Sequence, residues 1–255
     1  MRSPLRICAV AALSLACTSP FAIAQQKPQP AAPPAPYKAV AIVPPKPLND
    51  PAFEAFRKHV GDVARKRDRN ALAKLVAAHG FFWDRPGSPR TANNKGTGIE
   101  TLSAALGLAN PEAAGWDMLA GYTDDPTASP SPQHKSALCA PADPEFKAKD
   151  FNALLAATKT DASEWGYPVA PDTEVRASPQ IGAPVTDKLG LYFVRVVPDP
   201  SPAAAVAAML RIVMPSGAIG YIAADAIAPI GNDQICYVKD GGAWKIVGYI
   251  GSGDQ

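Results

Sequence analysis

Histidine, cysteine and the common catalytic motifs are scarce in this sequence. Its 255 residues include three histidines and four cysteines. No histidine has a second histidine at metal-ligand spacing, and no Cys-x-x-Cys pair occurs. The phosphate-binding lysine loop and the Gly-x-Ser-x-Gly elbow are absent as well. These absences exclude the enzyme classes that carry such motifs, and we predict no catalytic residue, no metal site and no cofactor.

No apolar run is long enough to cross a membrane, and the one at the N-terminus indicates export instead. Two arginines precede the apolar residues Ile7–Ala16, and small residues lead up to Ala24. This apolar core of about ten residues is too short to span a bilayer. We therefore predict a signal peptide over residues 1–24, cleaved after Ala24, and a periplasmic or secreted protein. The alternative is a lipoprotein signal at Cys17, although Ser14 stands where that processing normally has an aliphatic residue.

An excess of charge of one sign is lacking too. The formal net charge is +2, and the signal peptide removes two arginines and no acid, so the mature chain is neutral. A neutral chain lacks the basic surface that nucleic acids and anionic membranes attract. We expect no nucleic-acid partner and no transmembrane segment.

Proline, in contrast, is abundant, and it gathers just after the predicted signal peptide. Eight prolines lie between Pro28 and Pro47. Such a segment buries too little surface to offset its ordering entropy, and proline favours the extended polyproline II conformation. We predict a disordered linker over residues 25–49, acting as a spacer; a ligand for a partner domain is the alternative.

Residues 50–168 carry the signals of a small, mainly helical domain. Asp50-Pro51 combines a capping side chain with proline at the first helical position. An apolar stripe at helical spacing follows: Phe53, Phe56, Val60 and Val63. Thr97 to Glu100 has the spacing of a capping box and opens another helix. Between these helices, Phe81 to Trp83 is short, aromatic and strand-like.

Residues 169–255 predict a β domain that ends in a hairpin. Leu210 to Ile222 places two apolar runs around a Pro-Ser-Gly turn, which indicates two antiparallel strands. Five short strands with regularly spaced turn signals indicate a small barrel or sandwich. Asp240-Gly241-Gly242 joins two further strands, Ile235 to Val238 and Trp244 to Ile250, in a closing hairpin.

Part of this β domain shows short motifs in a fixed order: Val175-Arg176…Pro179, Pro184-Val185…Leu189-Gly190, Tyr192 to Val197, Leu210 to Val213 and Gly217…Gly220-Tyr221-Ile222. In this order, over roughly Glu174 to Ile230, the chain resembles the bacterial SH3-like domains. Two departures concern the ligand surface: Leu210 stands where the family often has tryptophan, and Pro198 to Ala208 lengthen the preceding loop. The resemblance implies an SH3-like β-barrel. Together with the helical region before it and the hairpin after it, we predict an α+β protein, with an N-terminal small helical domain and a C-terminal SH3-like β-barrel that has an extra closing β-hairpin.

The same resemblance implies a binding function. We expect an exported, non-catalytic binding or scaffolding protein of the bacterial cell envelope. Its ligand is expected to be a peptide or a peptidoglycan fragment, held against exposed aromatic residues, with Tyr192 and Tyr221 as candidates. One alternative is an enzyme of unrecognised type, with a pocket between the two domains near His79, Trp83 and Trp165. The other alternative is a structural partner of another envelope protein.

The helical region resembles, more weakly, the cone-shaped fold of the nuclear-transport-factor-like proteins. Paired helices followed by Phe81-Phe82-Trp83 are similar to the opening of that fold, and the closing hairpin is similar to its end. The resemblance implies that the closing hairpin pairs back onto Phe81 to Trp83.

Two cysteines, Cys139 and Cys236, remain after the predicted cleavage. Thiols in an oxidising compartment tend to pair. We therefore predict a disulfide between them; two buried free thiols are the alternative.

Overall fold

The computed structural model describes residues 34–85, 96–110, 114–180, 182–199 and 208–251. The predicted signal peptide and residues 25–33 of the predicted linker lie outside this range. The described residues form a mixed α+β fold, as expected. Its helices are α1 (Pro51–Arg65), α2 (Arg69–Leu75), α3 (Gly98–Leu106), α4 (Gly115–Asp124) and α5 (Ala148–Thr158). None of them is long and apolar enough for a membrane span.

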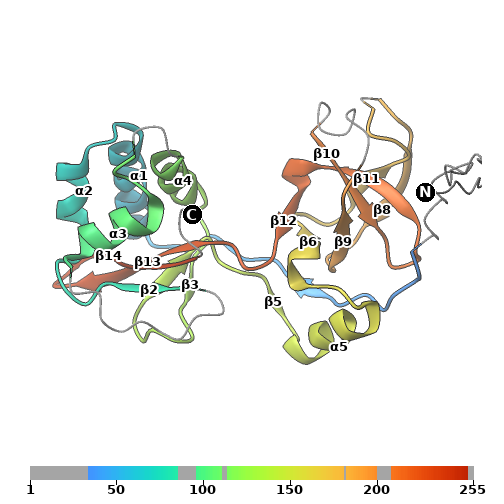
Figure 1. The fold of residues 1–255 in the computed structure, drawn as a ribbon, viewed down its shortest axis with the longest axis horizontal. Helices are drawn as coiled ribbons and strands as arrows, with labels where there is room; N and C mark the ends of the chain where they lie inside the picture. Colours follow the sequence, from blue (N-terminus) through green and yellow to red (C-terminus); the bar gives the residue numbers. More distant parts are fainter. Residues whose placement is uncertain (1–33, 86–95, 111–113, 181, 200–207, 252–255) are drawn as a thin grey trace, which may run out of the picture. The chain divides into compact units, whose positions relative to one another are not determined.

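The first large sheet combines strands from distant parts of the chain (Figure 1). Its hydrogen-bonded order is β2 (Phe82–Asp84), β14 (Ala243–Ile250), β13 (Gln234–Asp240), β4 (Leu138–Ala140) and β3 (Ser129–Pro130). The closing hairpin, β13 and β14, pairs in parallel with β2, so that Gly248 lies opposite Phe82 and Tyr249 opposite Trp83. This confirms the expected return of the hairpin to Phe81–Trp83.

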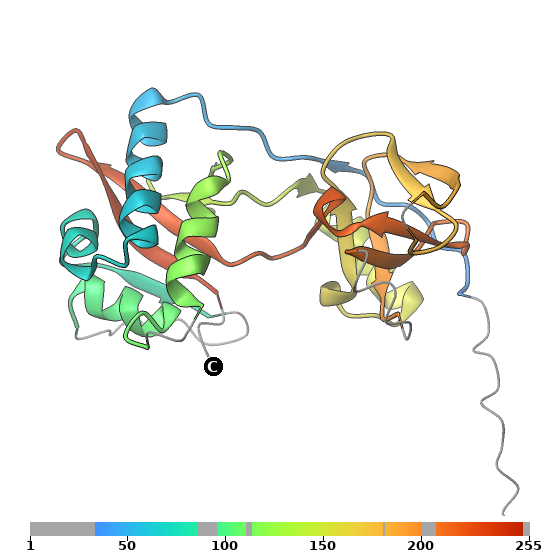
Figure 2. The same ribbon diagram turned by 90° about the horizontal axis from the view of Figure 1, so that it is seen from above.

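Helices α1 to α4 belong to the same hydrophobic core as this sheet, and Figure 2 shows α1 and α4 side by side. The predicted stripe of α1 is confirmed, because Phe53, Val60 and Val63 are buried. The Phe53 ring meets the rings of Tyr237 and Trp244 edge to face, at centroid distances of 5.1 and 5.0 Å. Asp50 caps α1 as expected by accepting hydrogen bonds from the first two amides that follow Pro51.

The second large sheet contains the strands of the resemblance. Its order is β12 (Ile227–Pro229), β6 (Trp165–Pro168), β9 (Val194–Val197), β10 (Met209–Val213), β11 (Ile219–Ala223), β7 (Thr173–Arg176) and β8 (Val185–Leu189). The expected hairpin is confirmed: β10 and β11 pair antiparallel, with Ile212 opposite Gly220. Among the described residues the hydrogen-bonded order runs from β12 to β8 and does not close on itself.

The strand pairing differs from the predicted division of the chain near residue 169. That division placed the closing hairpin with the β domain, whereas β13 and β14 pair with β2 and β4 of the other sheet. It also placed Trp165 to Pro168 with the helical region, whereas β6 pairs with β9 and β12. Local signals locate strands but carry no information about partners far away in sequence, because the side-chain pattern is the same in either sheet.

The linker prediction needs a correction from Pro34 onward. Val40 and Ile42 are only 6% and 5% exposed, in a hydrophobic cluster with Trp165 and Phe193. Strand β1 (Ile42–Val43) pairs antiparallel with β5 (Glu145–Phe146). The many prolines of residues 25–49 predicted a linker, so the short apolar pattern Val40-Ala41-Ile42 received no weight. In the structure this pattern is enough to bury Val40 and Ile42 and to form the short strand β1.

The predicted disulfide is present. Cys139 in β4 lies opposite Cys236 in β13, with Cα atoms 4.0 Å apart. This is within the limit of about 7 Å that the bond allows. Cys139 and Cys236 are buried together with Ala137, and Phe82 packs against this cluster. The bond therefore joins two strands that also share main-chain hydrogen bonds.

The pairing of the closing hairpin leads to a prediction about fragments. An isolated fragment of residues 170–255 should not unfold cooperatively, because β13 and β14 lose β2 and β4 and expose one face of a two-stranded ribbon. Circular dichroism during heating measures this, with the oxidised intact chain as the control. A cooperative β-structure transition in the fragment, at the midpoint of the intact chain, would contradict the prediction.

Candidate functional site

The candidate site is formed by the segment Pro34–Val43 and helix α5. The segment runs antiparallel to Gly190–Phe193, with a bridge between Ala41 and Tyr192. The Ile42 amide donates to the Leu191 carbonyl over 3.0 Å, and the Phe193 amide donates to the Val40 carbonyl over 3.1 Å. These bonds attach one edge of the segment to the residues between β8 and β9 of the second sheet.

Tyr37 anchors the beginning of this segment. Its amide donates to the Pro215 carbonyl in the turn between β10 and β11, and its hydroxyl donates to the Val213 carbonyl over 2.8 Å. Its ring meets the Trp165 ring edge to face at 5.0 Å. Burial raises the pKa of Tyr37, so the hydroxyl stays protonated and keeps its role as a donor.

The same turn makes room for the segment. The Gly217 backbone has φ of +84°, a conformation that side-chain-bearing residues rarely adopt. A Cβ atom at Gly217 would lie 2.6 Å from the Pro34 carbonyl oxygen. Glycine is therefore required at this position for two reasons: the turn needs its positive φ, and Pro34 leaves no space for a side chain.

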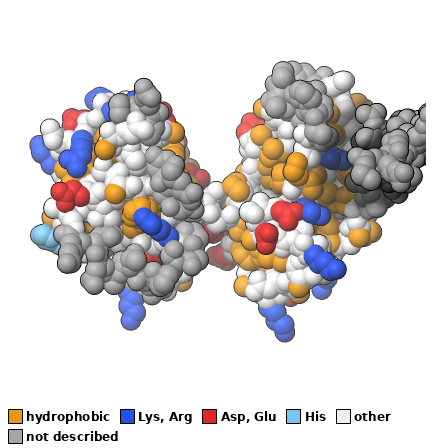
Figure 3. Space-filling view, in the orientation of Figure 1, with side chains coloured by type: hydrophobic (Ala, Val, Ile, Leu, Met, Phe, Trp, Pro, Cys, Tyr) orange, Lys and Arg blue, Asp and Glu red, His pale blue; other side chains and the backbone are white. Residues whose placement is uncertain are grey.

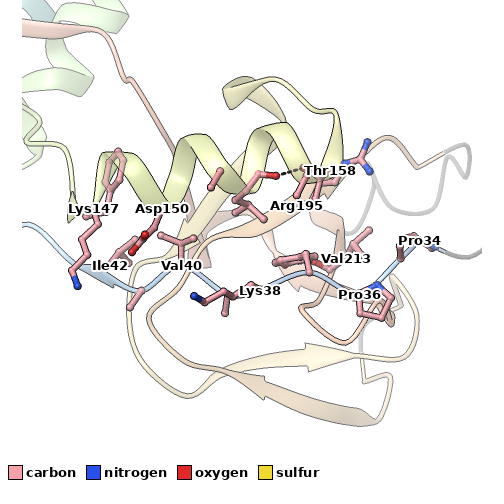
Figure 4. A pocket seen from close by; sticks show the side chains of 18 of the residues that line it. Pro34, Pro36, Lys38, Val40, Ile42, Lys147, Asp150, Thr158, Arg195 and Val213 are labelled. Carbon is pink, nitrogen blue, oxygen red and sulfur yellow. Dashed lines mark hydrogen bonds between the residues drawn. The ribbon is translucent and has the colours of Figure 1, made fainter.

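A groove of about 960 Å³ lies between the segment and α5 (Figure 4). Small side chains line both walls beside larger ones such as Tyr37 and Phe146; the small ones are Ala35, Ala39 and Ala41 on the segment, and Ala153 and Ala157 on the helix. In Figure 4 the helix crosses above the segment, and Asp150 extends from it toward Ile42. In the view of Figure 3, apolar side chains gather on the part of the molecule that contains the second sheet, with charged side chains scattered among them.

The charges along the groove are of two kinds. Arg195 is held by Glu164 at 2.7 Å, and this hydrogen-bonded pairing lowers the pKa of the Glu164 carboxyl. Four further charged residues, Lys38, Glu145, Lys147 and Asp150, are exposed and form no ion pair with any described residue. The Arg195 side chain is therefore held in place by Glu164, whereas the two lysines and the two acids are available to a ligand.

The two tyrosines expected to bind ligand do not line this groove. Tyr192 packs against the cluster that contains Val175 and Ile212. Tyr221 lies in β11, opposite Arg211 and Arg176 on the neighbouring strands. Burial is the main cause of a raised pKa of Tyr221, and a hydrogen bond to Asp199 raises this pKa further. Both rings are half-buried, and their role in binding stays a prediction.

The residues named for an enzyme pocket belong to separate environments. His79 is exposed, and Trp165 is in the cluster beside α5. Trp83 packs against the core of the first sheet and donates its indole N–H to the Gly251 carbonyl over 3.1 Å. The structure therefore does not place Trp83 and Trp165 in one cluster.

Sequence reasoning missed a histidine–carboxylate pair. The Nε2 atom of His134 lies 2.6 Å from Oδ2 of Asp84, and the imidazole stacks on Phe82 with centroids 3.5 Å apart. Among the described residues the imidazole hydrogen-bonds only Asp84, so the pair joins the loop before β4 to β2. Fifty positions separate the two residues, and no local pattern links them.

Metal binding and similarity to known proteins add no further site. Among the described ranges, no group of three or more histidine, cysteine, aspartate or glutamate side chains is placed to hold a metal ion. Comparison of the chain with protein-family models, with curated proteins and with solved structures gives no match.

Proposed function

We propose that this protein is an exported, non-catalytic binding or scaffolding protein of the bacterial cell envelope, and that its ligand is a peptide. The groove between Pro34–Val43 and α5 carries this proposal. Its volume lies in the range of about 300–1,000 Å³ that is usual for ligand sites. Small apolar side chains line both walls, which suits an extended chain more than a bulky ring system.

We also infer that Glu174 to Ile230 is an SH3-like domain. The observation in its support is that the quoted segments form strands β7, β8, β9, β10 and β11, and that these strands lie in one sheet. In this proposal Tyr192 and Tyr221 form a second candidate surface, for a peptide or a peptidoglycan fragment.

The proposed site is tested by filling the groove from the helix side. Twelve-residue peptides are selected from a random library on the full mature chain, and the affinity of the best synthetic peptide is measured by fluorescence anisotropy. The double variant A153L/A157L should weaken binding at least tenfold, because two leucines occupy the space of the ligand. Leucine is a good helix former, so α5 should remain folded.

A matched control lies on the same helix. Ala156 is exposed and does not line the groove, so A156L should leave the affinity unchanged. Loss of binding in Y192A or Y221A, with full binding in A153L/A157L, would move the site to the tyrosines. Binding of muropeptides alone, with no peptide selected, would overturn the choice of ligand.

Export is tested on protein from the native host. We expect its N-terminus at Gln25 and an intact mass without lipid, because small residues precede this position. Mass spectrometry of the intact protein and of its N-terminal peptide gives both values. A diacylated Cys17 at the N-terminus would instead show a lipoprotein.

A further inference from the structure

One edge of the segment Pro34–Val43 has main-chain groups without partners. Val40 and Ile42 direct their hydrogen bonds toward Gly190–Phe193. Neighbouring residues of an extended strand direct theirs to the opposite side. Among the residues that the structure describes, the N–H and C=O of Ala39 form no hydrogen bond.

 

The N–H of Ala41 also forms no hydrogen bond within the described ranges. Both residues line the groove. Unpaired N–H and C=O groups in a row are the template to which another strand can be added.

The chain itself occupies the first positions of this edge. Strand β5 pairs with β1, with Phe146 opposite Ile42 and Glu145 opposite Val43. In that register the residues after Phe146 would continue along Ala41 and Ala39. The chain instead enters α5 at Ala148, which leaves these positions open and places the helix along the other side of the groove.

We propose that the groove binds an extended segment of a partner protein as an added β-strand along Ala39–Ala41, continuing the line of β5. This inference rests on the proposed function and specifies how its ligand is held. Main-chain hydrogen bonds to the unpaired groups supply the attachment, and alternate side chains of the ligand face the alanines of α5.

The chemistry of the groove describes the partner segment. Side chains that face Ala153 and Ala157 are apolar, because these small residues leave space without polar groups. The groove carries charges of both signs without an ion-pair partner among the described residues, Lys38 and Lys147 together with Glu145 and Asp150. A partner segment with an acidic side chain near the lysines and a basic one near the acids complements them. The protein's own residues 25–33 fit poorly, because Pro28, Pro30 and Pro33 have no amide to donate.

The ligand's backbone provides the test. Each amide of the selected twelve-residue peptide is N-methylated in turn, and binding to the full mature chain is measured by anisotropy. An added strand predicts that binding falls at least tenfold when the one ligand amide that donates to the Ala39 carbonyl is methylated, and changes little at the two neighbouring amides, because these face away from the edge. A loss that follows the side chains in alanine variants, with no single sensitive amide in the methylated series, would overturn the strand geometry.

Variants of the protein separate this inference from the proposed function. A39P removes an unpaired amide, whereas A39V adds volume at the same position and keeps the amide. We expect A39P to weaken binding at least fivefold more than A39V, with equal melting temperatures. Full binding in A39P together with loss in A153L/A157L would keep the groove as the site and reject the added strand. Full binding in A153L/A157L would reject the groove itself.

Discussion

Reduction of the Cys139–Cys236 disulfide is expected to lower the melting temperature by about 10 °C or more. The bond closes a loop across a sequence separation of 97, and this loop contains every strand from β5 to β12. Loop-closure entropy assigns such a bond roughly 4 to 5 kcal/mol as an upper value. This is comparable to the whole stability of many domains. Calorimetry or circular dichroism with and without reductant measures the shift.

The control for this experiment is the double variant C139S/C236S. It should melt at the temperature of the reduced protein and should not respond to reductant. Thiol labelling of the unfolded, unreduced chain should find no reactive thiol from Cys139 or Cys236. Two labelled thiols per mature chain, or a melting temperature that reductant does not change, would contradict the predicted stabilisation.

Replacement of Gly98 by alanine is expected to destabilise the protein by about 3 kcal/mol. Gly98 is the first residue of α3, and its amide donates to the Ala78 carbonyl over 3.2 Å. A Cβ atom at this position would lie 1.9 Å from the Ala77 carbonyl oxygen and 2.9 Å from Cγ1 of Val76. The nearest atom is main chain, so no rotamer change relieves the overlap, and either α3 or the segment after α2 must move.

Gly121 supplies a matched control for G98A. It lies within α4, and a Cβ atom there would meet nothing within 4 Å. G121A should therefore leave stability unchanged or raise it by up to about 1 kcal/mol, because alanine favours a helix over glycine. Urea unfolding at equal denaturant slope compares the two variants. Equal stability of G98A and G121A would show that the approach of α3 to Ala77 is not constrained as described.

Short-range chemistry explains what was predicted from the sequence. The Asp50-Pro51 cap, the stripe of α1 and the capping box at Thr97 and Glu100 act within one helical turn. The turn between β10 and β11 depends on Gly217, whose φ of +84° suits glycine. The disulfide followed from counting the cysteines that remain after the predicted cleavage. Each of these inferences needed only neighbouring residues or composition.

The groove was not predicted, because its two walls belong to distant parts of the chain. The segment near Val40 and Ile42 lies in a stretch whose prolines favour a linker, and two buried side chains are a weak local signal. In the sequence, Ala153 and Ala157 look like solvent-exposed residues of an amphipathic helix. Only the tertiary structure places the segment Pro34–Val43 across the groove from them. The contact between His134 and Asp84 could not be predicted for the same reason, because fifty positions separate the two residues in the sequence.

The sequence by itself determined the α+β class, the positions of most helices and strands, and the two cysteines able to pair; the export signal stays a prediction. These features depend on propensity, caps, turns and residue counts, which act locally. The tertiary structure alone decided that β13 and β14 join β2 and β4. It alone also decided that the segment Pro34–Val43 lies against Gly190–Phe193 and has main-chain groups without partners on its other edge. Strand pairing and burial join residues far apart in the chain, and their free energy arises only when both surfaces are present.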